Sequence, residues 1–220
     1  MADTRHDPVV VIGLGRFGSA LALELTARGT EVLAVDSRAK TVQALSGQLT
    51  HCVTADCTDV EALHQLGVPE FSRAVVGIGT DIESSILVTS LLSELEIETI
   101  WAKAITRQHG RILERIGAHH VVFPEHDMGE RVAHLVSSSM LDYVELDEDH
   151  ALIKTNPPQR YVGVPLRETR PRSRSGVTIV AVQPHNGELT HASADTVLNY
   201  GDAVFVLGRI QDVERFAEST

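Results

Sequence analysis

Short runs of β-branched residues alternate with helix-spaced apolar residues along the first two thirds of the chain. Residues 9–12 read Val-Val-Val-Ile, typical of a buried strand, and residues 17–25 then place apolar side chains at helical spacing before Gly29. The unit recurs, with strands predicted at 31–35, 51–54, 74–78, 99–103 and 119–123 and helices at 41–49, 60–66, 84–95, 107–116 and about 128–141. Strands alternating with helices in this way predict an α/β fold: a Rossmann-type doubly wound parallel sheet covered on both faces.

The pattern changes after Tyr143, where strands follow one another with only short helices. An acidic junction at 142–149 leads to strands predicted at 151–155, 177–182 and 203–207, with a breaker at Pro157-Pro158. Residues 185–188, His-Asn-Gly-Glu, predict a hairpin turn, and a short helix is expected from Ile210. These elements predict a small α+β C-terminal lobe. We therefore expect two domains, residues 1–141 and residues 142–220.

Composition adds an expectation about location. The chain has 220 residues, and none of its apolar runs approaches the ~18 residues that a membrane span needs. Met1 to Asp7 lack the basic start and apolar run of a signal peptide. Cys52 and Cys57 do not have the spacing of a disulfide framework or a Cys-x-x-Cys pair, which fits a reducing compartment. We expect two free thiols and a cytoplasmic protein.

The formal net charge of −11 argues against a general nucleic-acid binder, because a surface of that sign repels phosphate backbones. One segment is an exception. Five arginines gather in a proline-containing, helix-poor stretch of the C-terminal lobe: Arg160, Arg167, Arg170, Arg172 and Arg174. This stretch is either a solvated loop or a contact for an anion such as phosphate.

The chemistry begins at residues 13–18, Gly-Leu-Gly-Arg-Phe-Gly, which fit the pattern G-x-G-x-x-G. The motif follows a strand, opens a helix, and is followed by Asp36 at the end of the second strand. Gly13 permits the tight turn, Gly15 lets the backbone approach phosphate, and Gly18 lets the helix pack closely on the strand. The helix N-terminus offers free N–H groups to an anion, and Asp36 would accept hydrogen bonds from ribose hydroxyls. This context predicts a nucleotide site.

Further candidate contacts follow the carboxyl ends of the other strands, where open α/β sheets bind their ligands. Asp56 and Cys57 follow the third strand and are expected to flank the adenine, although Asp56 also suits a capping or turn role. Lys103 ends the fifth strand and points either to phosphate or to solvent. The neighbours of these positions complete the candidate set: Phe17, Ser37, Arg38, Ile78, Gly79, Thr80 and Ala104.

Charged and histidine residues near this site suggest an ion. Arg16 lies inside the glycine loop, where a cation suits a ligand with extra phosphate charge; the alternative is an exposed arginine at the helix start. His119, His120 and His126 lack the spacing of a closed zinc site. Glu125, at the start of the long helix, is better placed as one carboxylate ligand of Mg²⁺ or Ca²⁺ shared with ligand phosphates.

These residues together resemble a known family. Residues 13–18, 32–36 (Val-Leu-Ala-Val-Asp), 100–104 (Ile-Trp-Ala-Lys-Ala), 116–118 (Ile-Gly-Ala) and 124–129 (Pro-Glu-His-Asp-Met-Gly) resemble the potassium-transport regulatory proteins of the Ktr/Trk type, and their KtrA branch in particular. Such proteins consist of an RCK N-terminal domain and an RCK C-terminal lobe. The resemblance spans nearly the whole chain.

The resemblance implies a gating role. Family members dimerise through the long crossover helix, here residues 127–141, and form an octameric ring beneath an integral-membrane potassium channel subunit. ATP or ADP binds in the Rossmann cleft. By analogy Arg16 would reach the γ-phosphate, Glu125 would hold a divalent cation, and Lys103 and His109 would lie near the ligand. C-terminal lobes of the family can bind cyclic di-AMP; residues 164–170 correspond only loosely to that site.

Catalysis is not required for this role, and we expect no enzyme activity. The chain has no Gly-Lys-Ser/Thr loop for nucleotide hydrolysis. The alternatives are an NAD-dependent oxidoreductase, for which the C-terminal lobe is small, and a redox sensor that binds NADH without reacting. Asp36 would serve the ribose of ATP, ADP and NAD alike.

Overall fold

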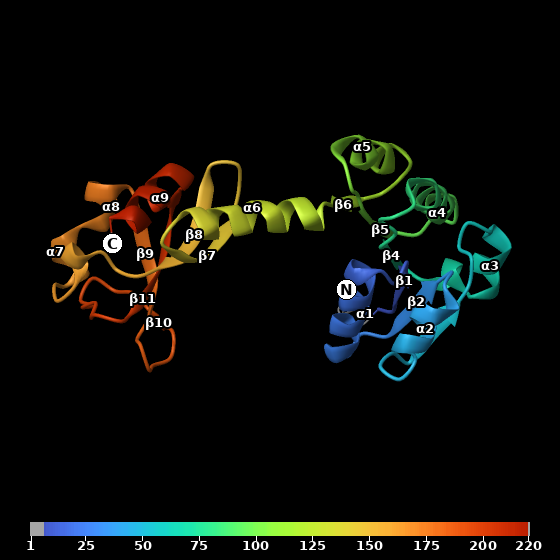
Figure 1. Ribbon diagram of the computed structural model, residues 1–220, viewed down its shortest axis with the longest axis horizontal. Coiled ribbons are helices and arrows are strands. Elements are labelled where there is room, and N and C mark those ends of the chain that lie inside the picture. Colours follow the sequence, from blue (N-terminus) through green and yellow to red (C-terminus); the bar gives the residue numbers. More distant parts are fainter. Residues whose placement is uncertain (1–6, 220) are drawn as a thin grey trace. The chain divides into compact units, whose positions relative to one another are not determined.

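The computed structural model describes residues 7–219 of the chain. Residues 1–6, which enter the expectation about a signal peptide, lie outside the described residues. The chain forms two compact units that divide between Glu125 and His126. The first unit alternates strands and helices as Figure 1 shows: β1 (Val9–Ile12), α1 (Arg16–Ala27), β2 (Val32–Asp36), α2 (Ala39–Leu45), β3 (His51–Thr54), α3 (Val60–Gln65), the 3-10 helix η2 (Val68–Glu70), β4 (Arg73–Val76), α4 (Ile82–Glu94), β5 (Thr99–Lys103), α5 (Arg107–Arg115) and β6 (His120–Val122).

The six strands of this unit form one parallel sheet in the order β3-β2-β1-β4-β5-β6. The first strand pairs with β2 on one side and with β4 on the other, in the registers Val10 to Leu33 and Val10 to Ala74. The chain order therefore reverses direction between β1 and β4. Open sheets bind ligands in the crevice at the carboxyl ends of the strands beside such a reversal.

Helices cover both faces of this sheet, and alternate residues of its central strands pack into different cores. Val10 and Ile12 of β1 belong to a core that includes Leu63 of α3, Val88 of α4 and Leu113 of α5. The other face contributes Val9 and Val11 to a separate core with α1 and the end of α2, represented by Ala22, Leu25 and Leu45. The predicted doubly wound Rossmann-type sheet is confirmed.

The second unit is a small α+β lobe, as expected. Helix α6 (Pro124–Ser137) leads into it, followed by β7 (Met140–Glu145), β8 (His150–Thr155), η3 (Gln159–Tyr161), α7 (Leu166–Thr169), α8 (Pro171–Ser175), β9 (Thr178–Gln183), β10 (Thr190–His191), β11 (Ala203–Arg209) and α9 (Ile210–Glu218). Its antiparallel sheet has the order β10-β9-β11-β8-β7. Buried side chains of the sheet pack on α9, where the rings of Tyr161 and Phe216 lie 5.2 Å apart.

Two predicted elements between the units are wrong in position or type. The long helix runs from Pro124 to Ser137 rather than from about 128 to 141, because proline suits the first turn of a helix. The residues from 142 that were expected to form an acidic junction belong to strand β7, in which Met140 and Tyr143 are buried. The acidic turn itself is shorter, with Asp147 Oδ1 accepting hydrogen bonds from the amides of Asp149 and His150.

The arginine-rich segment is also more helical than expected. It contains η3, α7 and α8 in succession. Pro165 precedes α7 and Pro171 opens α8, so the prolines start these short helices instead of preventing them. Gly176 ends α8 in the left-handed conformation, with φ +71°.

The division between the units differs from the predicted domain boundary after residue 141. The difference lies in α6, whose Leu135 packs against the core of the second unit. Assigning this helix to the first domain concerns its role in dimer formation and stays a prediction. Among the described residues, the helices fall short of the length and apolar character needed to cross a bilayer.

Candidate functional site

The glycine loop between β1 and α1 is held by close backbone contacts. Gly13 has φ +91°, which favours glycine, and its amide donates to the Val35 carbonyl at 2.8 Å. A Cβ on Gly18 would overlap the Gly13 carbonyl oxygen, and one on Gly77 would approach the same oxygen to 2.7 Å. Gly15 differs, because a Cβ there would meet no atom within 4 Å. Gly13, Gly18 and Gly77 therefore shape the loop, while Gly15 leaves its open side free.

Asp36 fastens this loop to the end of β2. It is buried, and its Oδ2 accepts a hydrogen bond from the Leu14 amide at 2.7 Å. Oδ1 accepts from the Arg38 amide at 2.9 Å and from Arg38 Nε at 3.0 Å. Burial raises the pKa of Asp36, but the hydrogen bonds from Arg38 and the two backbone amides outweigh it and hold that pKa below its usual value. The carboxylate is therefore ionised at neutral pH.

A buried cation lies across the loop from Asp36. Lys103, the last residue of β5, is 7% exposed, and its Nζ donates to Glu125 Oε1 at 2.6 Å. Glu125 stands in the first turn of α6. The Lys103 hydrogen bond lowers the pKa of Glu125, with a smaller contribution in the same direction from the charge of Arg16. Cations and one carboxylate thus meet beside the glycine loop.

These groups line one cavity with a volume of about 490 Å³, within the usual range for ligand sites. The cavity lies at the carboxyl ends of β1 to β5, and all of its lining belongs to the first unit. Fourteen of the residues singled out from sequence line it: Gly13, Gly15, Arg16, Phe17, Asp36, Ser37, Arg38, Asp56, Cys57, Ile78, Gly79, Thr80, Lys103 and Glu125. Their role as ligand contacts stays a prediction.

Three residues of the candidate set lie outside this lining. Gly18 packs against Gly13, and Ala104 belongs to the core under the sheet. His109 on α5 is 2% exposed, and neither of its ring nitrogens has a hydrogen-bond partner among the residues that the structure describes. Burial lowers the pKa of His109, which favours the neutral ring.

Asp56 and Cys57 form the wall of the cavity after β3. Asp56 Oδ1 accepts from the Thr58 amide at 3.0 Å and from Thr58 Oγ1 at 2.7 Å, so Asp56 makes a turn while also lining the cavity. The N-cap of α3 is Asp59. Cys57 is buried, and burial followed by the nearby charges of Asp56 and Asp36 raises the pKa of its thiol to about 12. Both cysteines are free thiols, as expected.

Sequence reasoning missed eight lining residues: Ile12, Ala55, Thr58, Gly77, Asp81, Ser84, Val88 and Ile105. Three of them carried a detectable signal. Asp81 and Ser84 stand at helix-start spacing, and Asp81 caps α4 by accepting from the Ser84 amide at 3.1 Å. Gly77 directly follows a buried strand, and a second glycine, Gly79, comes two residues later. This pattern indicates a close backbone approach.

The histidines near β6 have separate partners. His119 Nδ1 accepts from the Ile100 amide at 3.1 Å. His120 stacks on Trp101, with ring centroids 4.1 Å apart. Within residues 7–219, groups of three or more His, Cys, Asp and Glu side chains placed to hold a metal ion are not found.

The second unit has a hollow of its own, about 520 Å³ in volume, beside α7, α8 and β9. Arg167, Arg170 and Arg172 line it, together with Thr178 and Ser193. Arg167 forms an ion pair with Asp195. Arg160 instead donates to Ser219 Oγ at 3.2 Å and lies over the ring of Tyr161. Three of the five clustered arginines therefore line one hollow, whose other lining residues include the apolar side chains of Leu166, Val177 and Ile179.

Comparison with known proteins adds the family. The TrkA-N domain model matches residues 9–124, and the TrkA-C domain model matches residues 151–220. The chain is 38% identical over 207 residues to Ktr system potassium uptake protein C of Bacillus subtilis (strain 168), covering 94% of each. It is 33% identical over 217 residues to Ktr system potassium uptake protein A of the same organism, covering 98% of each.

Solved structures of the GsuK channel have a similar fold. The GsuK channel bound to NAD matches all of this chain with a TM-score of 0.65 and 18% identity, over 40% of its own length. GsuK bound to ADP matches 61% of this chain with a TM-score of 0.52 and 25% identity, over 35% of its own length. The chain therefore spans less than half of the GsuK chains that it matches.

Proposed function

This chain belongs to the TrkA-domain family of Ktr-type potassium uptake proteins, and we propose that it is a regulatory subunit switched by ATP or ADP in the cavity of its first unit. Family membership supports a part in potassium transport. The observation that carries the proposal is the cavity itself, where the glycine loop and Asp36 suit a nucleoside phosphate. Arg16 and Lys103 add positive charge where its phosphates would lie.

The ion pair between Lys103 and Glu125 supports a way of telling ATP from ADP. A phosphate chain competes with the Glu125 carboxylate for Lys103 Nζ, which is buried and donates to Glu125 at 2.6 Å. Arg16 is exposed at the start of α1 and would contact a third phosphate, which ADP lacks. A ligand shifts an equilibrium between two shapes only by its differential affinity for them. The γ-phosphate supplies such a difference.

A divalent cation fits this arrangement only when phosphate shares it. Mg²⁺ and Ca²⁺ prefer oxygen ligands, and Glu125 offers one carboxylate. The Glu125 side chain is 59% exposed and forms an ion pair with Lys103. Phosphate oxygens and water would supply the remaining coordination. In this proposal Glu125 turns from Lys103 to the cation when the triphosphate binds.

Assembly and partner are further parts of the proposal. Helix α6 carries the exposed apolar side chains of Met128, Val132 and Val136 at successive i,i+4 positions, a stripe that suits pairing with a second helix. We propose that the chain dimerises through this helix and forms an octameric ring. The ring would sit at the cytoplasmic side of an integral-membrane potassium channel subunit and act on it without catalysis.

The arginine-lined hollow of the second unit supports a second ligand, cyclic di-AMP. Arg167, Arg170 and Arg172 offer guanidinium donors to its two phosphates, and the hollow is large enough for part of a dinucleotide. We propose that this ligand is shared with the same surface of a second copy. Binding there would close the transporter.

Calorimetric titration of the purified protein with ATP, ADP, NADH and cyclic di-AMP, each with and without Mg²⁺, tests the proposal. We expect tight binding of ATP and ADP, with an ATP advantage that requires Mg²⁺. The Arg16→Ala variant should lose that advantage, while Arg28→Ala, which removes an exposed arginine paired with Glu24 outside the cavity, should keep it. Tight NADH binding without adenine-nucleotide binding would favour the NADH sensor or the oxidoreductase instead.

A further inference from the structure

Arg38 occupies positions that an adenosine ribose would need. Asp36 Oδ1 accepts hydrogen bonds from the amide and Nε of Arg38, and Oδ2 accepts from the Leu14 amide and from Arg38 Nη2 at 3.3 Å. A carboxylate has about four lone-pair sites. All four are engaged, so a ribose hydroxyl reaches Asp36 only after the guanidinium of Arg38 has moved.

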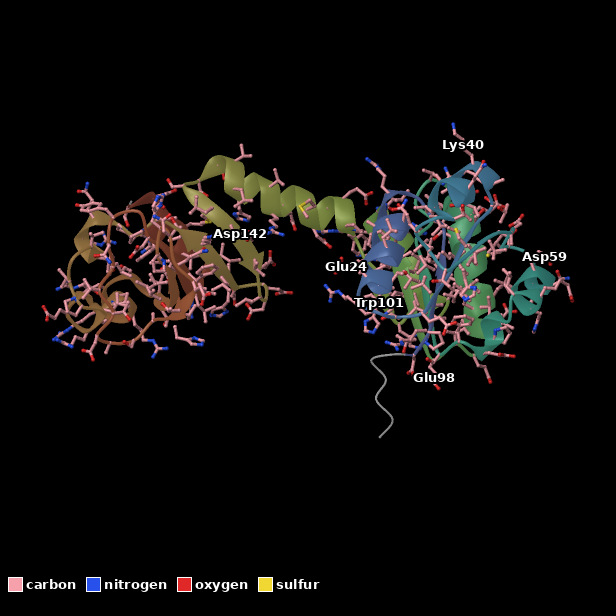
Figure 2. The ribbon with its side chains drawn as sticks, turned by 90° about the horizontal axis from the view of Figure 1, so that it is seen from below. Glu24, Lys40, Asp59, Glu98, Trp101 and Asp142 are labelled. Carbon is pink, nitrogen blue, oxygen red and sulfur yellow. The ribbon has the colours of Figure 1, made fainter. Side chains whose placement is uncertain are left out.

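The surroundings of Arg38 leave its guanidinium able to turn toward a ligand. Its side chain is 63% exposed, whereas that of Asp36 is 5% exposed. Asp36 keeps the backbone amides of Leu14 and Arg38 as donors when the guanidinium leaves. The neighbouring cation, Lys40 on α2, points outward from the first unit in Figure 2 and is not a lining residue of the cavity. Arg38 is thus the cation that faces the ribose end.

We propose that Arg38 makes the ribose end of this cavity a site for adenosine nucleotides that carry a 2′-phosphate, as NADP(H) does, beside those with a free 2′-hydroxyl. The inference rests on the proposed nucleotide-binding function and names a ligand class for the same cavity. In Rossmann folds the acidic residue after the second strand accepts the 2′-hydroxyl, and a nearby arginine accommodates a 2′-phosphate. This chain carries both residues, two positions apart.

The charge balance favours a phosphate at this position. The positive charge of Arg38 offsets the negative charge of Asp36, which would otherwise repel a phosphate group. The planar guanidinium matches phosphate oxygens with two parallel N–H donors, a geometry that lysine does not offer. Without Arg38 the Asp36 carboxylate faces the 2′ position with free acceptors and a net negative charge. Removal of the arginine should therefore reverse the preference of the site.

Two small ligands isolate this effect, because 5′-AMP and adenosine 2′,5′-bisphosphate differ only in the 2′-phosphate. Their affinities would be measured by calorimetry at one ionic strength for the wild type, Arg38→Ala, Arg38→Lys and Lys40→Ala. We expect the wild type to bind the bisphosphate at least as tightly as 5′-AMP. In Arg38→Ala the ratio of the two affinities should fall roughly ten- to a hundredfold, the range expected for loss of a charged hydrogen bond.

The other variants sharpen the result. Arg38→Lys keeps the positive charge but loses the paired N–H donors of the guanidinium. Its ratio of bisphosphate to 5′-AMP affinity should therefore lie between those of the wild type and Arg38→Ala. Lys40→Ala removes a charge of the same sign two residues away and should leave the ratio unchanged within about twofold. Equal losses in Lys40→Ala and Arg38→Ala would indicate general charge attraction and overturn the inference. Thermal unfolding checks that each variant is folded.

The outcomes separate this inference from the proposed function. If the wild type binds 5′-AMP and ATP but rejects the bisphosphate, or if Arg38→Ala leaves the ratio unchanged, the inference about Arg38 is wrong and the nucleotide cavity stands. If none of the adenine nucleotides binds, the proposed function fails and this inference fails with it.

Discussion

Replacing Gly18 with alanine probes the close approach of α1 to the Gly13 carbonyl in the glycine loop. Gly18 lies in the first turns of α1, and a Cβ there would overlap the carbonyl oxygen of Gly13 and stand 3.1 Å from its carbonyl carbon. The obstacle is backbone, which cannot rotate aside as a flexible side chain can. Gly77, directly after β4, lies so close to the same oxygen that a Cβ there would stand 2.7 Å from it, so the Gly13 carbonyl has little room to move.

The expected change in stability combines two opposing effects. Inserting a methylene-sized group into a packed region costs about 3 kcal/mol in an unyielding site. Alanine in place of glycine inside a helix returns about 1 kcal/mol of propensity. The net expectation is a loss of about 2 kcal/mol in the free energy of unfolding, which lowers the melting temperature by roughly 4–8 °C. Without the overlap the variant would be more stable than the wild type, so the sign of the change is informative.

Gly15→Ala is the matched control, three residues away in the same glycine motif. Gly15 has φ −67° and nothing within 4 Å of an added Cβ, so its melting temperature should change by the equivalent of about 1 kcal/mol or less. Its methyl group would instead face the cavity and weaken nucleotide binding. Thermal unfolding followed by circular dichroism and calorimetric titration with ATP measure the two effects. A Gly18→Ala protein that melts at or above the wild-type temperature would refute the reasoning.

Three other predictions follow from the same contacts. Phe216→Ala removes a side chain that is 1% exposed, and urea unfolding of the second unit should show a loss of about 3–5 kcal/mol. Lys103→Met should return the depressed pKa of Glu125 toward its ordinary value in an NMR titration. A lowered folded pKa adds stability above the unfolded pKa that is lost as pH falls through the folded one, so this pH dependence of stability should weaken in the variant. An unchanged Glu125 titration would contradict the ion pair. In iodoacetamide labelling at pH 8, Cys52 should react before Cys57, whose thiol is buried and has a pKa of about 12, and the reverse order would contradict the burial.

Local patterns were enough to predict the first unit. Its central strands are short β-branched runs such as Val9–Ile12, buried on both faces, and the helices between them repeat apolar residues at helical spacing. Such elements are specified by residues close together in the sequence. The prediction was wrong where the pattern was mixed, in the segment from Pro124 to Glu145. There acidic residues in β7 masked a strand that is recognisable from its burial against β8.

The nucleotide motif was predictable for the same reason. A tight turn, a close phosphate approach and a close helix contact each need glycine at one position, and all three positions fall within six residues. Asp36, the acidic residue of the motif, ends the next strand. The glycine part of the motif is therefore a local property of one strand, one loop and one helix.

What only the tertiary structure decided is how residues distant in sequence meet around that motif. The Lys103 ammonium donates a hydrogen bond to Glu125 rather than to solvent, because β5 ends and α6 begins at the same edge of the sheet. Gly77 meets Gly13 because β4 pairs with β1. Arg38 folds back on Asp36 and fills its acceptor sites. A sequence states which charges and donors exist, whereas hydrogen bonds depend on distances of about 3 Å, which only the packed chain sets.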